Sequence, residues 1–220
     1  MAIEVAAHKI AYMALPKAAC SSVKSALAHL DPSVDLSKTE GFEPAFGRWH
    51  AIYPTMRFRP HRWEKYDEGW WRFCVVRDPA KRLMSCYTNR VVQLRELHNS
   101  KKLRRGEVDL PMDPDPDFFF SNLMAYKDAA SSIKHHVLPA QLFLGPPPMK
   151  YDRIYMVAEL GQLAKDLAKR TGTEVTMARE NTSGGGLAVT DLKPATQDAL
   201  RPYLAREYDY FGKWYENPLD

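Results

Sequence analysis

Cysteine is scarce in this sequence, and long apolar runs are missing. The 220 residues contain three cysteines (Cys20, Cys74 and Cys86), an odd number without C-x-x-C spacing. This pattern argues against a disulfide scaffold or a zinc knuckle, and it indicates a reducing compartment. No stretch approaches the ~20 apolar residues that cross a bilayer, and no basic segment followed by an apolar run opens the chain. We therefore expect a cytoplasmic protein without a membrane span, unless an N-terminal anchor has been removed.

Strong charge of one sign is missing as well. The formal net charge is +4 and the pI is about 8.9. That balance suits an anionic ligand but is too mild to predict nucleic-acid binding. No cluster of Asp, His and Cys has metal-ligand spacing, so we expect no metal. The hydrophobic share of 45% and the charged share of 26% are those of a folded globule, and the length predicts a single domain over residues 1–220.

Apolar residues recur in alternating strand and helix patterns. We predict strands at 8–15, 71–76 and 152–157, and helices at 21–30, 79–97, 118–133, 159–170 and 194–207. Polar and Pro-rich stretches predict an exposed loop at 98–116 and a loop-rich insertion at 31–69 that holds one strand near 49–53. This alternation is typical of an α/β fold with a mainly parallel sheet covered by helices on both faces.

Local signals predict how two of these helices begin. Ser21 or Ser22 is a suitable N-cap for the first helix. Asp78 is the expected N-cap of the second, with Pro79 at the first helical position, where a missing N–H costs nothing. Asp78 and Arg82 are four residues apart, a spacing that allows them to pair on the helix surface.

The segment LPKAACSSVK at residues 15–24 lies between a predicted strand and a predicted helix. A turn of small residues there brings backbone N–H groups and the positive end of the helix dipole to one point, which suits a phosphate or a sulfate. Lys17 adds a positive charge, and Ser21 and Ser22 add hydroxyl donors. A plain loop with a solvated lysine is the alternative. The pattern G-x-x-x-x-G-K-[ST] is absent, which disfavours an ATP-hydrolysing or kinase-type loop.

The segment FCVVRDPAKRLMSCY at residues 73–87 also joins a strand to a helix. Arg77 stands at this junction, and its planar guanidinium can hold a phosphate through two parallel hydrogen bonds. Ser85 lies further along the same helix, where it could equally be a surface serine without a role.

Together the two segments resemble the 5′-phosphosulfate loop and the 3′-phosphate segment of sulfotransferases that use 3′-phosphoadenosine-5′-phosphosulfate (PAPS). The likeness is greatest to the branch of carbohydrate (chondroitin- and dermatan-type) sulfotransferases and their bacterial relatives. It continues through HVLPAQ at 136–141, YDRI at 151–154 and YDYFG at 208–212, in the family's order.

The resemblance implies a P-loop-like PAPS-binding fold that transfers a sulfuryl group to the hydroxyl of a glycan or small-molecule acceptor, with PAP as product and no metal. Lys17 would stabilise the leaving phosphate, while Arg77 and Ser85 would hold the 3′-phosphate. The residues that would cradle the 5′-phosphate are Ala18, Ala19, Cys20, Ser21 and Ser22. Many members have a glycine where this chain has Ala18-Ala19.

A hydroxyl that attacks sulfur needs a base, and histidine suits that task near neutral pH. We predict His50, which resembles the family's base segment, with His61 and His136 as alternatives. His136 and Gln141 are expected to line the acceptor side, although a structural role for His136 is equally open. Residues 181–186 are expected to form a lid. Two other functions stay open, a non-catalytic module that binds PAP or carbohydrate and a kinase-like nucleotide enzyme.

Overall fold

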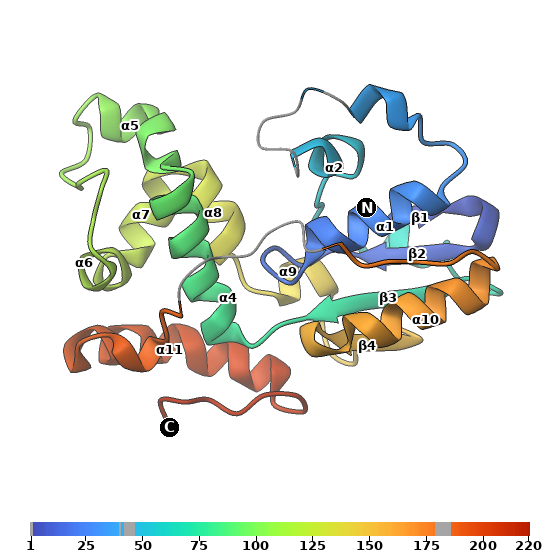
Figure 1. The fold of residues 1–220 in the computed structure, drawn as a ribbon. Coiled ribbons are helices and arrows are strands. Elements are labelled where there is room, and N and C mark those ends of the chain that lie inside the picture. The colour runs from blue at the N-terminus through green and yellow to red at the C-terminus, as the bar shows by residue number, and fades with distance from the viewer. Residues whose placement is uncertain (1, 40, 42–46, 179–185) are drawn as a thin grey trace. The chain divides into compact units, whose positions relative to one another are not determined.

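The computed structural model describes residues 2–39, 41, 47–178 and 186–220. They group into two compact units, and the chain enters each unit twice. The first unit comprises Met1–Arg77 and Ala140–Thr182, and the second comprises Asp78–Pro139 and Ser183–Asp220 (Figure 1). The single domain expected from the chain length stays a prediction.

A four-stranded sheet forms the centre of the first unit. Its strands are β1 (Ile3–Val5), β2 (Ile10–Met13), β3 (Trp71–Val76) and β4 (Arg153–Met156), in that spatial order. The pairs β2–β3 and β3–β4 are parallel, and β1 pairs with β2 in the antiparallel sense. Because β2 and β3 run the same way, the segments that follow them leave from the same edge of the sheet. Those segments are the two with predicted anion chemistry.

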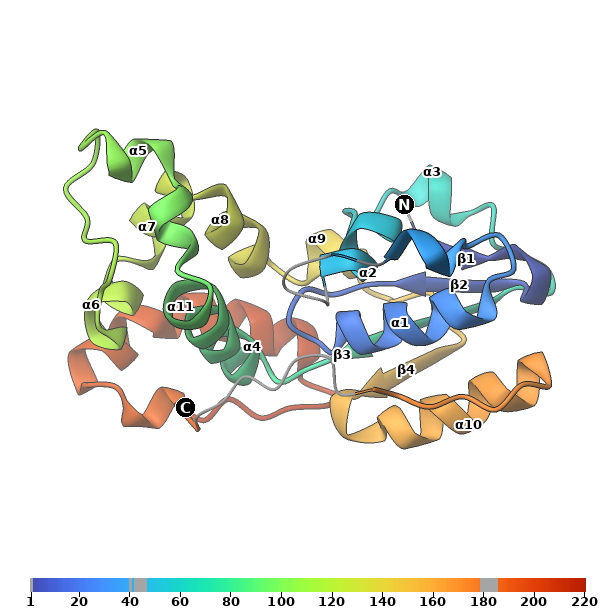
Figure 2. The same ribbon diagram turned by 45° about the horizontal axis from the view of Figure 1, so that its top comes forward.

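Helices cover this sheet, as the sequence predicts for an α/β fold. The helices of the first unit are α1 (Cys20–Leu30), α2 (Gly47–Ile52), α3 (Pro60–Trp63), α9 (Gln141–Leu144) and α10 (Leu160–Thr171). Both α1 and α10 pack on this sheet (Figure 2). They bury apolar side chains in one core with alternate strand residues such as Tyr12 and Phe73, whose rings stack at 4.9 Å. The intervening strand residues Ala11 and Cys74 are buried too, so both faces of the sheet are covered.

The strand expected near 49–53 is wrong, because this stretch forms α2. The Tyr53 N–H donates to the Trp49 carbonyl at 3.0 Å, which is the hydrogen bond of a helical turn. Trp49 and Tyr53 are four residues apart and both buried, so their side chains lie on the same side of this helical turn.

The second unit is helical. Its helices are α4 (Pro79–Cys86), a π-helix (Tyr87–Gln93), α5 (Lys101–Arg104), α6 (Pro116–Ser121), α7 (Leu123–Ala129), α8 (Ser131–Val137) and α11 (Pro194–Phe211), with short 3₁₀ turns at Glu96–Asn99 and Val189–Asp191. The single helices predicted at 79–97 and 118–133 are therefore interrupted. Arg95 adopts a left-handed backbone conformation that ends the first, and Ala130 has an extended conformation that separates α7 from α8.

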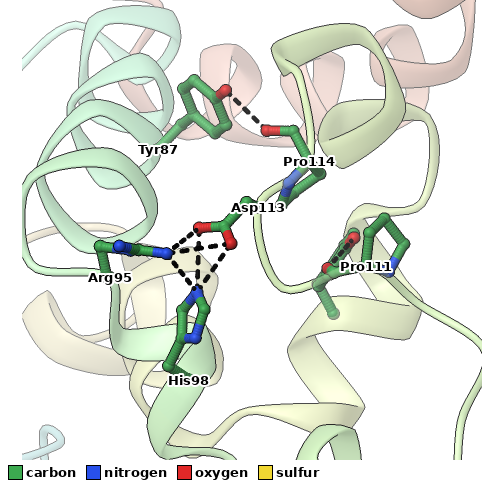
Figure 3. A network of polar contacts seen from close by, with 7 residues as sticks. Tyr87, Arg95, His98, Pro111, Asp113 and Pro114 are labelled. Atoms are coloured by element: carbon green, nitrogen blue, oxygen red, sulfur yellow. Dashed lines mark hydrogen bonds and ion pairs between the residues drawn. The ribbon is translucent and has the colours of Figure 1, made fainter.

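The stretch 98–116 is more ordered than the exposed loop that its composition predicts. It contains α5, which Ser100 caps and Leu103 anchors in the core of the unit. Asp113 accepts hydrogen bonds from His98 and Arg95 at 2.9–3.2 Å, and the Tyr87 hydroxyl donates to the carbonyl of Pro114 (Figure 3). These bonds hold the stretch against the helix that precedes it.

The start of α4 confirms one prediction and corrects another. Asp78 caps the helix by accepting from the Lys81 N–H at 2.8 Å, and Pro79 occupies the first turn, as predicted. The surface pair of Asp78 with Arg82 is wrong. Arg82 is 1% exposed, and its guanidinium donates instead to Glu207 of α11 at 2.6 Å.

Candidate active site

The turn after β2 is built from residues in unusual backbone conformations. Lys17 (φ 65°) and Ala19 (φ 55°) both lie in the left-handed region, and the Ala18 N–H closes the turn on the Leu15 carbonyl at 3.2 Å. Such a conformation costs a non-glycine residue about 1–2 kcal/mol. Backbone strain of this size is typical of functional sites.

This turn leads into α1 without a capping side chain. Ala19 is the N-cap and makes no side-chain hydrogen bond, so the prediction of Ser21 or Ser22 as N-cap is wrong. Both serines lie instead in the first helical turn, where they are nearly buried. The N–H groups of a first turn have no partner within their own helix, and the N-cap Ala19 has no side chain that could accept from them. An anion is the partner that such a helix start favours.

The structure brings the two predicted anion segments together within the first unit. Arg77 follows β3 directly, and its Nη1 donates to the carbonyl of Lys17, 60 residues earlier, at 3.0 Å. Both side chains are half-buried. Because the parallel strands β2 and β3 end at the same edge, the sheet topology itself accounts for this contact.

His50 also lies at the turn, although it comes from α2. Its Nε2 is 2.9 Å from the Ser21 hydroxyl, and its Nδ1 is 3.0 Å from the ammonium of Lys24. A second bond fixes the far end of the same helix, since the Tyr53 hydroxyl donates to Asp31 at 2.6 Å, just after α1. The segment with the predicted base is thus fastened to α1 at two points.

Lys24 is a functional candidate that the sequence analysis does not name. Its side chain has no exposed surface, and its ammonium donates to Thr55 Oγ1 at 2.7 Å. Burial lowers the pKa of Lys24 to about 8, because a charged group loses its hydration there. No carboxylate among the described residues forms an ion pair with it. Its position three residues after Ser21 was the available signal, since that spacing places both on one side of a helix.

Ser85 and His136 belong to the second unit. Ser85 is buried in the last turn of α4. His136 is nearly buried in α8, and its Nδ1 donates to the carbonyl of Ser132, one turn earlier, at 2.7 Å. This bond is the kind that a structural histidine makes. The Tyr208 hydroxyl, from the YDYFG stretch, donates to Asp78 at 3.0 Å and so links α11 to the start of α4.

The remaining candidates lie in less informative places. Gln141 begins α9 in the first unit and is exposed. His61 is exposed on α3. Residues 181–185 of the expected lid lie outside the described part of the chain. The roles given to all of these residues from the sequence stay predictions.

A comparison with models of protein families assigns the chain to a family. A sequence model described as "Sulfotransferase family" matches residues 4–212, which is nearly the whole chain. The chain belongs to the sulfotransferase family. The match includes the turn at Lys17, the strand that ends at Arg77 and the histidine of α2, so this sulfotransferase carries its candidate site within the matched region. The comparisons found no significant match to a curated protein or to a solved structure.

The described residues include neither a membrane-spanning helix nor a cluster of metal ligands. No helix among them is both long and apolar enough to cross a membrane. No group of three or more His, Cys, Asp or Glu side chains in the same part of the chain could hold a metal ion.

Proposed function

We propose that this sulfotransferase moves a sulfuryl group from PAPS to an acceptor hydroxyl, with a carbohydrate as the favoured acceptor class. The observation that carries the proposal is the turn at residues 15–19. Two of its residues have left-handed backbone conformations, and it leads into a helix whose N-cap makes no side-chain hydrogen bond. The guanidinium of Arg77 donates to the carbonyl of Lys17 in the same turn. Family membership supports the sulfuryl transfer and suggests PAPS as the donor. The carbohydrate acceptor rests on the sequence resemblance.

The residues at the turn fit the phosphosulfate end of such a donor. The first-turn N–H groups of α1 and the hydroxyls of Ser21 and Ser22 would hold the 5′-phosphate. The guanidinium of Arg77, which donates to the Lys17 carbonyl, would bind the 3′-phosphate through its planar fork. Ser85 is proposed to assist it. PAPS supplies the sulfuryl group when bound.

Two side chains would act on the reacting atoms. Lys17 would stabilise the negative charge that develops on the phosphate oxygen as the sulfur–oxygen bond breaks. His50 would take the proton of the acceptor hydroxyl. Its bond to Ser21 supports this role, because it fastens the imidazole beside the first turn of α1. His61 and His136 are the other candidates.

A panel of ligands tests the proposal and separates it from the alternatives. We expect PAP and PAPS to raise the melting temperature more than ATP and AMP, since a ligand at 100 times its Kd stabilises by ~2.7 kcal/mol. A larger shift with ATP would instead support a kinase-like nucleotide enzyme. Sulfation of a panel of glycan and small-molecule hydroxyls then distinguishes an enzyme from a module that only binds PAP.

A further inference from the structure

Lys24, His50 and Ser21 form a continuous hydrogen-bonded chain between α1 and α2. Lys24 Nζ lies 3.0 Å from Nδ1 of His50, and Nε2 of the same ring lies 2.9 Å from the Ser21 hydroxyl. Thr55 accepts a further bond from Lys24 at 2.7 Å. An ammonium has three donors and no acceptor, so Nδ1 must accept from a charged Lys24.

This constraint fixes the other bonds of the chain. A neutral imidazole carries one ring proton, and if Nδ1 accepts, that proton is on Nε2. Nε2 then donates to the Ser21 oxygen, and the hydroxyl proton of Ser21 points away from the ring. In this state Nε2 cannot take a proton from an acceptor. An imidazolium would carry a proton on Nδ1 as well and would lose its bond to the ammonium.

We propose that the charge of Lys24 selects the tautomer of His50, which makes Lys24 a positioning residue of the site. A charged Lys24 keeps the ring proton on Nε2, while a neutral Lys24 allows it on Nδ1, where it is donated to the amine lone pair. In the change between them the ammonium releases one proton to solvent, and the ring exchanges its proton from Nε2 to Nδ1 and stays neutral. The catalytic consequence rests on the proposed function, because only the second tautomer leaves Nε2 able to act as a base.

The surroundings of Lys24 allow this switch near neutral pH. From α1 the titratable group that faces it is Cys20, from α2 it is His50, and the segment after α2 contributes the uncharged Thr55. The described residues provide no carboxylate in ion-pair contact that would hold the ammonium charged. Burial lowers the pKa of Lys24 to about 8, so its charge changes between pH 7 and 9.5.

The tautomer can be read without turnover by ¹⁵N NMR of the full chain labelled at histidine, with the His50 signals assigned by their loss in His50→Gln. We expect a proton on Nε2 at pH 7 and a shift towards the Nδ1 tautomer by pH 9.5, with a midpoint near 8. An unchanged tautomer across this range, or a proton on Nδ1 already at pH 7, would overturn the proposal.

Two variants of Lys24 test whether it causes the change. Lys24→Met has no donor, and Lys24→Arg stays charged at pH 9.5. We expect neither variant to shift the His50 tautomer between pH 7.5 and 9.5, with an amide spectrum as the check on folding. If Lys24→Met shows the wild-type shift, Lys24 is not the cause. Should the buried arginine prevent folding, the methionine variant still decides.

Activity then tests the base role separately. If His50 is the base, kcat of the wild type should rise by up to about tenfold between pH 7 and 9.5, the factor by which a group of pKa about 8 gains its neutral form, and that of Lys24→Arg should not. A tautomer switch without this rise would support the role of Lys24 and remove His50 as the base.

Discussion

Arg77 holds two parts of the candidate site at once, since it lies at the end of β3 and donates to the carbonyl of Lys17. We expect Arg77→Ala to weaken the binding of PAP by at least tenfold, because a charge-assisted contact is worth ~1.5–3 kcal/mol. AMP lacks the 3′-phosphate, so its affinity should fall much less. Calorimetric titration of both ligands checks this, with Arg62→Ala, an exposed arginine of α3, as the control. Equal losses for PAP and AMP would contradict the assigned role.

Lys17 belongs to the same turn but should act at a different stage. Its charge matters most when negative charge builds on the departing phosphate oxygen. Lys17→Ala should therefore lower kcat far more than it weakens the binding of PAP. Steady-state kinetics with saturating PAPS, beside a binding titration, measures the two effects. The exposed Lys169 of α10 gives a matched lysine-to-alanine control. A variant that binds poorly yet turns over normally at saturation would rule out this role.

Ala19 allows the backbone strain of the turn before α1 to be measured. It adopts φ 55° as the N-cap of α1, where glycine carries no steric penalty. We expect Ala19→Gly to leave the free energy of unfolding unchanged or to raise it by up to ~1 kcal/mol, because relief of strain offsets the greater freedom of the unfolded chain. As a control, Ala164→Gly inside α10 should lower the free energy of unfolding by ~1 kcal/mol. Urea denaturation compares them, and equal losses would mean that residue 19 is not strained.

At the scale of elements, the packing of α4 against α11 depends on a buried charge pair. Arg82 and Glu207 are 1% and 4% exposed in their side chains, and Arg82 also donates to the Leu138 carbonyl at 3.2 Å. Glu207→Gln leaves the guanidinium buried without its counter-charge, so we expect a loss of ~3–5 kcal/mol in stability. Replacement of both residues by Met and Leu should cost much less, since Nε and Nη1 of Arg82 are already buried without a hydrogen-bond partner among the described residues.

A double-mutant cycle in urea measures this coupling. The exposed pair of Arg201 with Asp198 on the same helix α11 is the control, and Asp198→Asn should change stability by less than ~1 kcal/mol. Additive effects of the Arg82 and Glu207 substitutions would show that the two charges do not depend on each other.

Elements whose pattern is local could be predicted from the sequence, and elements fixed by distant partners could not. The strands β2, β3 and β4 and the helices α1 and α10 all show their own periodicity. The strand β1 has three residues, too few to show alternation. At the site, Lys17 and Arg77 could be named as candidates because each follows the end of a strand, and the structure places them in contact. Lys24 was missed because its partner His50 is 26 residues away, and Arg82 was misread because Glu207 is 125 residues away.

For the whole molecule, Lys24 predicts an unusual dependence of stability on pH. Its pKa is lowered in the folded state to about 8 from 10.5, so between these values the unfolded chain binds more protons than the folded one. Stability must then rise with pH across this window, and for Lys24 the gain between pH 8 and 10 is about 2 kcal/mol. The contribution is absent below pH 8, where both states bind the proton.

Urea denaturation of the wild type and of Lys24→Met at pH 8, 9 and 10 isolates this effect. The wild type should gain about 2 kcal/mol relative to the variant across the series. Tyrosines with raised pKa values act in the opposite sense above pH 10, but both proteins share them, so they cancel in the difference. If the free energy of unfolding changes equally with pH in the two proteins, folding does not lower the pKa of Lys24.

Each unit is formed by two separate segments of the chain, and this affects the order in which the sheet can form during synthesis. When residue 77 leaves the ribosome, β3 is complete, but its partner β4 ends at residue 156 and the whole of 78–139 comes between. At ~5–20 residues per second, the outer edge of β3 waits roughly 4–16 seconds for its neighbour. An open strand edge is a template for pairing with other chains. The nascent protein should therefore depend most on chaperones while residues 78–156 are translated, before β4 can pair with β3 and complete the sheet that supports the candidate site.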